Sequence, residues 1–260
     1  KKPLKEKETI ETKTIKVSTT DPECGVFHKG EHKKVFAYTS NTACDRNNYI
    51  LGFEVAPGNT HDSVSFPSLY NKLIQEYADI KNVVVDAGYK TPALARLIIE
   101  SEKTPIMPYK RPMTKAGFFK KKDFVYDEML GGYICPNDQV LKYSTTTKNG
   151  YREFKSDKNK CATCPFLSKC TNSKNHTKVI TEHVWNNYLL QAEETRYTLG
   201  SKDIYSKRKE TIERCFGDGK ENFGLRFTRY KGLKRVTQGL LLLFACMNFK
   251  KMARWKAMTA

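Results

Sequence analysis

The chain has 260 residues, enough to bury a substantial core, and its 46 Lys and Arg against 28 Asp and Glu give a net charge of +18. So large a positive excess predicts a polyanionic partner, of which nucleic acid is the commonest. The apolar run at residues 240–247 is shorter than the roughly 20 residues that span a bilayer, which argues against a membrane protein. The charged start has no apolar signal region, so a cytoplasmic chain is expected, with its eight cysteines as thiols or metal ligands rather than disulfides.

The N-terminal third predicts three neighbouring strands. Residues 1–13 are a run of charges and are expected to be a linker. Strands are predicted at residues 14–20, 33–43 and 49–56, because each stretch is rich in β-branched and aromatic residues and is bounded by turn residues. Three adjacent strands joined by short turns favour an antiparallel meander.

The next segment predicts alternating helix and strand. A helix is expected over residues 60–77, capped by Thr60 or Asp62. Residues 82–86, NVVVD, form a continuous apolar run that is typical of a central strand buried on both faces. A helix at 91–100 and a strand at 105–108 follow, and this order of elements is that of a ribonuclease-H-like mixed α/β sheet.

The amino-acid composition changes from residue 110 onward. Residues 110–200 are rich in Lys, Gly, Thr and Asn, with short strand-like pieces and a cysteine cluster, and they predict a small β insertion into the core of residues 14–109. Residues 201–260 are expected to complete the core, with one helix that begins at Tyr205 and an apolar helix over residues 236–255.

Two carboxylates are the candidate metal ligands. Asp86 ends the apolar strand, and the carboxyl ends of such strands are where α/β sheets place their chemistry. Glu213 lies on the predicted helix, where helical spacing places Lys209 and Lys220 on the same face. Two Mg²⁺ or Mn²⁺ ions about 4 Å apart, held by such carboxylates, can activate the attacking oxygen and stabilise the leaving oxygen of a phosphodiester. The structural alternatives are a solvated helix face for Glu213 and a turn-forming role for Asp86.

The ordered motifs of the chain resemble the DDE transposases of bacterial insertion sequences, in particular the branch with a Tyr–Arg–Glu–Lys signature and a cysteine-bearing insert. The motifs that carry this resemblance are STTDPE, GNTHDS, VVVDAGY, YSKRKETIERCFGDGKENFG, RYKGLKRV and MNFKKMARW, and they cover nearly all of residues 14–255. The resemblance implies a ribonuclease-H-like fold, metal-dependent cleavage at element ends and strand transfer into target DNA. It also implies a homodimer in the DNA complex and a location at the bacterial nucleoid.

Five positions carry over from the family signature. Asp86 matches its second catalytic Asp, and Glu213 matches its catalytic Glu. Lys220 matches its Lys, which the resemblance assigns to DNA contact, and Tyr205 and Arg208 match its Tyr and Arg loosely. The Arg–Glu spacing is one residue longer than in the family pattern, so Lys209 is the alternative for the place of the Arg.

The first catalytic Asp of the family is the main departure. Residues 1–20 contain no Asp, so either Asp21 serves or the residue lies upstream of Lys1. The second alternative is favoured, because the charged start resembles the linker that follows that strand in relatives. A chain with two of the three carboxylates is expected to be inactive alone, since small displacements of the ions are costly in catalysis.

Four cysteines of the insertion predict a structural Zn²⁺ site. The spacing is Cys161-x2-Cys164-x5-Cys170, with Cys135 upstream. Thiolates at this spacing suit tetrahedral Zn²⁺, and such a metal would stabilise a small region with few apolar residues. An iron–sulfur cluster and free thiols remain alternatives, and His176 or His183 is a possible replacement ligand.

A basic stretch follows the Glu213 helix and is predicted to bind DNA. Basic groups interleaved with aromatic rings suit phosphate contact and stacking on unpaired bases. The basic members are Arg226, Arg229, Lys231, Lys234 and Arg235.

Three functions follow in order of preference. The first is a transposase catalytic domain, the second is a catalytically incomplete DNA-binding remnant of one, and the third is a ribonuclease-H-like nuclease without strand transfer.

Overall fold

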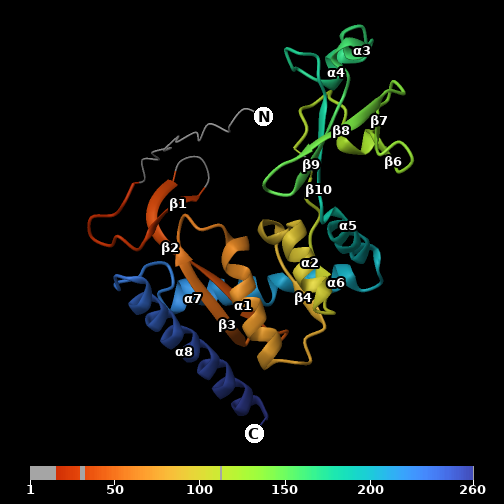
Figure 1. Ribbon diagram of the computed structural model, residues 1–260. Helices are drawn as coiled ribbons and strands as arrows, with labels where there is room; N and C mark the ends of the chain where they lie inside the picture. Colours follow the sequence, from red (N-terminus) through yellow and green to blue (C-terminus); the bar gives the residue numbers. More distant parts are fainter. Residues whose placement is uncertain (1–15, 30–32, 112, 260) are drawn as a thin grey trace, which may run out of the picture. The chain divides into compact units, whose positions relative to one another are not determined.

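The computed structural model describes residues 16–29, 33–111 and 113–259. Helices and strands both occur along the chain, so the predicted mixed α/β class is confirmed (Figure 1). The chain divides into two compact units: the first joins the residues up to Ala78 with those from Ser206 onward, and the second is Asp79–Tyr205. The ribonuclease-H-like arrangement and the predicted domain bounds stay predictions.

The first unit contains the predicted three-stranded meander, although its first strand is not where the sequence pattern placed it. The antiparallel order is β1 (Gly25–Lys29), β2 (Lys33–Cys44) and β3 (Ile50–Pro57). The strand predicted at 14–20 is wrong for residues 16–20, which carry no strand, and residues 14 and 15 lie outside the described residues. Ser18 explains the difference, because its hydroxyl bonds Thr20 at 3.3 Å and accepts from the Asp21 N–H at 3.2 Å. These local side-chain bonds compete with a strand ladder.

Helix α1 (Asp62–Glu76) packs on this sheet through an apolar face of four buried side chains. Its side chains reach β3 at Gly52, where an added Cβ would lie 3.2 Å from Leu69. The helix begins one residue away from the expected caps, because His61 is the N-cap and its ring accepts from the Ser63 N–H at 3.2 Å. The four buried residues are Phe66, Leu69, Tyr70 and Leu73.

The long helix α8 (Leu233–Thr259) lies along β3 and closes the core of the first unit (Figure 1). Phe244 makes an edge-on contact with Phe53 of β3, with ring centroids 5.1 Å apart. Asn248 bonds the backbone of Ile50 twice: its Oδ1 accepts from the N–H at 3.0 Å, and its Nδ2 donates to the C=O at 2.9 Å. The buried members of this core are Ile50, Cys215, Phe244 and Met247.

The second unit begins with a parallel strand pair, β4 (Asn82–Val84) and β5 (Thr104–Ile106). The predicted helix between them is confirmed as α2 (Pro92–Glu100), capped by Thr91, whose hydroxyl accepts from the Leu94 N–H. Strand β4 belongs to a two-stranded sheet, and its own residues are exposed or half-buried rather than buried on both faces. The expectation of a central strand buried on both faces is therefore wrong.

The five-stranded antiparallel sheet of the second unit confirms the strands predicted in the insertion. Its spatial order is β10-β9-β8-β7-β6. Strand β10 was not predicted, and it pairs with β9 along its whole length. The strands are β6 (Val125–Asp127), β7 (Gly132–Ile134), β8 (Val140–Thr146), β9 (Tyr151–Lys155) and β10 (Val179–His183).

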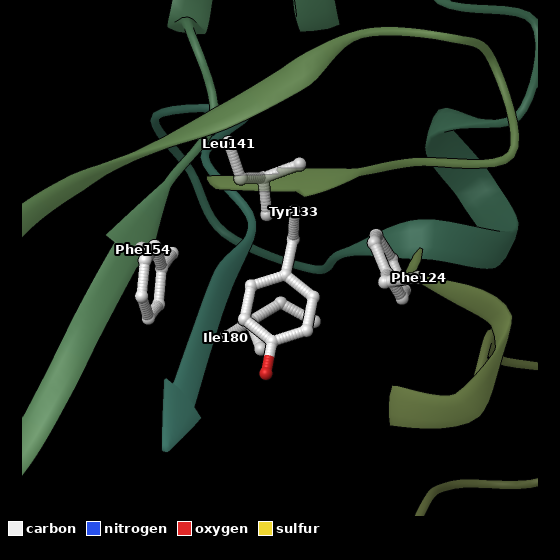
Figure 2. Packing of buried hydrophobic residues seen from close by; sticks show 5 residues of the cluster. All are labelled: Phe124, Tyr133, Leu141, Phe154 and Ile180. Carbon is white, nitrogen blue, oxygen red and sulfur yellow. The ribbon is translucent and has the colours of Figure 1, made fainter. Parts of the chain in front are cut away.

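A small cluster forms the core of this sheet, and three of its five residues are aromatic (Figure 2). Tyr133 and Phe154 pack edge to face with centroids 5.0 Å apart. The hydroxyl of Tyr133 donates to Glu182 Oε1 at 3.0 Å, which satisfies the polar end of a buried ring. The remaining members of the cluster are Phe124, Leu141 and Ile180.

Short helices complete the chain, and no helix in the described ranges is long and apolar enough to cross a membrane. The α-helices are α3 (Lys158–Ala162), α4 (Leu167–Cys170), α5 (Asn186–Glu194), α6 (Ser201–Ser206) and α7 (Ile212–Asn222). The 3-10 helices are η1 (Ala87–Tyr89), η2 (Lys121–Asp123), η3 (Thr195–Tyr197) and η4 (Lys207–Lys209).

Candidate active site

Asp86 lies just beyond the carboxyl end of β4, where a parallel strand pair places functional groups. It is half-buried and is the N-cap of η1, with its Oδ1 accepting from the Gly88 N–H at 2.8 Å. The strand is fixed up to this point, because the neighbouring Val85 is buried and its N–H donates to the Ile106 carbonyl at 3.2 Å. The carboxylate is thus held at the strand end by local backbone geometry.

Lys90 anchors the segment that follows Asp86, and the sequence pattern did not single it out. Its side chain is only 5% exposed, its Nζ donates to the Pro108 carbonyl at 2.9 Å, and it contacts the carboxylate of Glu193. Burial, with Arg196 and Lys110 nearby, lowers the pKa of Lys90 to about 8, whereas the Glu193 contact favours the charged form. Lys90 follows Asp86 by four residues, but its burial arises from contacts with Pro108 and Glu193, so the sequence carried no signal for it.

Glu213 lies in the first turn of α7 and is exposed. Its carboxylate makes no hydrogen bond or ion pair with any residue in the described part of the chain. A negative side chain is favoured in a first helical turn by the exposed N–H groups and the helix dipole. Glu213 therefore has an unoccupied carboxylate on a rigid element.

The helix that bears Glu213 is shorter than predicted. The single helix expected from Tyr205 is divided into α6, η4 and α7, with Thr211 at φ −107° and ψ −99°, outside the helical range. The hydroxyl of Thr211 donates to the Lys207 carbonyl at 2.8 Å, so a side-chain bond closes the preceding turn. Lys209 lies in η4, and the predicted helical face that joined it to Glu213 is wrong; Lys220 stays on α7 with Glu213.

Asp21 has three hydrogen-bond donors around its carboxylate. The Tyr38 hydroxyl donates to Oδ1 at 3.0 Å and Oδ2 at 2.9 Å, the Glu23 N–H to Oδ1 at 3.3 Å, and the Gly232 N–H to Oδ2 at 3.1 Å. Burial opposes ionisation of Asp21, but the bonds from Gly232, Tyr38 and Glu23 outweigh it and lower the pKa of its carboxyl. This set of bonds ties the chain before β1 to the loop before α8.

The predicted DNA-binding residues spread over several consecutive elements. Tyr205 lies in α6, while Arg208 and Lys209 lie in η4. Arg226 pairs with Glu221, and residues 227–231 after it are exposed. Arg229 and Lys231 belong to this loop, and Lys234 and Arg235 to the first turn of α8.

The four cysteines of the predicted zinc site gather beside the five-stranded sheet. Cys135 and Cys170 both pack against its core, and a turn bond from the Cys164 N–H to the Cys161 carbonyl at 3.1 Å joins the other two. Burial raises the pKa of the Cys170 thiol; Lys178 opposes the shift, and the other three thiols add to it. The four side chains are therefore neighbours and half-buried.

Part of the chain resembles a known protein family. Residues 134–253 match the family model of the transposase DDE domain. The match covers less than half of the chain, and it includes Glu213, Lys220 and the four cysteines but neither Asp86 nor Asp21. No curated protein and no solved structure matches the chain.

The match supports a DNA-acting enzyme of the nuclease or transposase class, and transposase DDE domains generally use divalent metal ions. Carboxylate oxygens such as those of Asp86 and Glu213 have the chemistry that Mg²⁺ and Mn²⁺ prefer. Across residues 16–29, 33–111 and 113–259, no group of three or more His, Cys, Asp or Glu side chains is arranged to hold a metal ion. Asp86 and Glu213 belong to different compact units.

Proposed function

We propose that the chain is the catalytic domain of a DNA transposase that cleaves transposon ends and transfers the strands to target DNA. The observation that carries the proposal is the match of residues 134–253 to the transposase DDE domain. The net charge of +18 supports it, because a polyanionic substrate needs basic partners.

Asp86 and Glu213 are the proposed metal-binding carboxylates. The placement of Asp86 at a strand end and the unpaired, exposed carboxylate of Glu213 support these roles. Bound Mg²⁺ or Mn²⁺ would supply activation of the attacking oxygen and stabilisation of the leaving oxygen. Asp21 is the weaker candidate for a third carboxylate, because three donors already surround its oxygens.

The proposed DNA contacts are the signature and basic residues of the same region. Lysine and arginine side chains that contact phosphates release counterions from the DNA, which favours binding. The proposed set is Tyr205, Arg208, Lys209, Lys220, Arg226, Arg229, Lys231, Lys234 and Arg235. A homodimer that pairs two transposon ends belongs to the same proposal.

A nicking assay tests the catalytic proposal. In Mg²⁺, the full-length protein is expected to cut DNA that carries terminal inverted repeats, and Asp86→Asn or Glu213→Gln is expected to lower the rate roughly 100-fold or more, because displaced ions are costly. Glu76→Gln, an exposed carboxylate at the end of α1, is the matched control and should leave the rate unchanged.

The outcomes separate the competing functions. Cutting without preference for the ends would favour a nuclease over a transposase. A full-length wild-type protein that binds DNA but never cuts it would overturn the catalytic proposal and leave a DNA-binding remnant. Unchanged cutting by Asp86→Asn would remove Asp86 from the site.

We also propose that Cys135, Cys161, Cys164 and Cys170 hold one structural Zn²⁺. Their chemistry and their closeness support the proposal, although the side chains would have to turn toward a shared ion, as the absence of an arranged ligand group within the described residues indicates. Elemental analysis of the purified chain should find about one zinc per chain. A Cys161→Ser/Cys164→Ser variant should bind none, and a Cys24→Ser/Cys246→Ser variant should keep it; iron in place of zinc would indicate a cluster instead.

A further inference from the structure

Two adjoining polar hollows lie on the first unit, beside the helix that bears Glu213. The larger, of about 500 Å³, lies among the turn before β3, α7 and α8. The smaller, of about 410 Å³, shares Asn48 and Arg214 with the first and extends toward η4. Because they share these two residues, we treat them as one surface, which we call the Arg214 track.

Basic side chains dominate the lining of the Arg214 track. Three carboxylates line it as well, and two of them already have basic neighbours: Asp218 lies 3.9 Å from Lys250, and Glu221 contacts Arg226. The third carboxylate is Glu210. The six basic lining residues are Arg46, Lys207, Arg214, Lys250, Lys251 and Arg254.

Four of these cations have no protein partner. The side chains of Arg46, Lys207, Arg214 and Arg254 are exposed and make no hydrogen bond or ion pair with any residue in the described ranges. Like charges held close together repel one another, and a bound polyanion would relieve that repulsion. Guanidinium groups are suited to phosphate because their fixed fork of donors matches two phosphate oxygens.

The track adjoins the candidate active site through one helix. Arg214 directly follows Glu213 in α7, about 100° further around the helix axis. A strand whose phosphates lie on Arg214 would therefore lie within one helix residue of Glu213, which itself lines neither hollow.

We propose that the Arg214 track binds the sugar–phosphate backbone of the DNA strand and guides it toward Glu213. The inference rests on the proposed function for the identity of the polyanion. Its exposed cations, spread over two adjoining hollows, favour a polymer over a single phosphate ion, which a compact buried cradle would suit better.

Salt-dependent DNA binding by the whole 260-residue chain tests the proposal. Binding of a labelled DNA duplex is followed by fluorescence anisotropy at several salt concentrations, without divalent metal. The variant Arg46→Gln/Arg214→Gln/Arg254→Gln is expected to weaken binding tenfold or more at low salt and to reduce the slope of log Kd against log salt by about two to three, since each lost phosphate contact lowers it by about 0.9. The variant with Lys at the same three positions should retain most of the slope.

A control of equal charge makes the result specific to the track. Lys148, Lys158 and Lys160 are exposed, carry no described partner and lie in the second unit. Their triple Gln variant has the same net charge and should change affinity and slope much less. An equal loss in the two triple variants would overturn the proposal, as would a track variant that loses inorganic phosphate binding but binds DNA normally.

The outcome is separable from that of the catalytic proposal. Asp86→Asn should lose cutting and keep the salt slope, whereas the track variant loses the slope in a metal-free assay. If Asp86→Asn cuts normally, the catalytic proposal fails while the track result stands.

Discussion

The two antiparallel sheets of the molecule are stabilised in different ways. The β1–β3 sheet has α1 and α8 packed along β3, and a side chain of α8 bonds the strand backbone directly. The β6–β10 sheet has a core of five buried residues, and only short helices flank it in sequence. A sheet with so small a core depends on each of its large side chains, whereas a helix-covered sheet distributes its burial over many residues.

Truncation of Phe154 should give the largest effect and sharpen this contrast. Phe154 is 2% exposed and touches three aromatic neighbours, so Phe154→Ala is expected to destabilise the second unit by about 3–5 kcal/mol. Amide hydrogen exchange in β8 and β9 measures the loss. The control Phe227→Ala removes a ring that is 87% exposed and should change amide exchange little. If Phe154→Ala lowered protection equally in β2 and β3, the two sheets would not be stabilised separately.

Removal of the Asn248 side chain tests the helix-to-strand link of the first unit. Asn248→Ala leaves the N–H and C=O of Ile50 without partners, which should cost about 1–3 kcal/mol. Exchange of the β3 amides should quicken, and that of β8 and β9 should not. The control is Gln238→Ala at an exposed position of the same helix; if it destabilises equally, the two hydrogen bonds do not explain the loss.

An effect of comparable size, confined to alkaline pH, is expected at Lys90. Because the pKa of Lys90 is about 8 when folded and near 10.5 when exposed, the unfolded chain binds the proton first as pH falls, and this group's contribution to stability falls from about pH 10 toward pH 8. Lys90→Met should remove that slope, so its stability relative to wild type should be higher at pH 8 than at pH 10 by about 2 kcal/mol. Urea unfolding at both values measures it, and parallel curves would show that Glu193 keeps Lys90 charged throughout.

The strands β6 to β9 were predictable because they are short pieces with β-branched or aromatic residues that turn residues separate. The failures share a physical cause, namely local side-chain bonds that periodicity does not reveal. Ser18 and Asp21 bond their own neighbourhood where a strand was expected, and Thr211 closes a turn within the expected helix. β10 was missed because it is only five residues long, too short for a clear strand pattern. Pairing with β9 along its whole length stabilises it.

For the candidate site, residue type and element ends were enough to single out Asp86, Glu213 and the four cysteines. Lys90 was missed because its burial depends on Pro108 and Glu193, which tertiary packing brings to it. The cations of the Arg214 track were missed for a similar reason, since Arg46 and Arg254 are distant in sequence and line adjoining hollows only in the folded chain.

The double bond between Asn248 and Ile50 has a consequence for self-association. β3 is an outer strand of its sheet, and the exposed backbone of such a strand invites pairing with another chain. At Ile50 the backbone N–H and C=O are both hydrogen-bonded to the side-chain amide of Asn248, as they would be to a neighbouring strand. α8 thereby blocks strand addition at Ile50. Local detachment of α8 would expose this edge of β3 to pairing with another chain while the sheet is still folded.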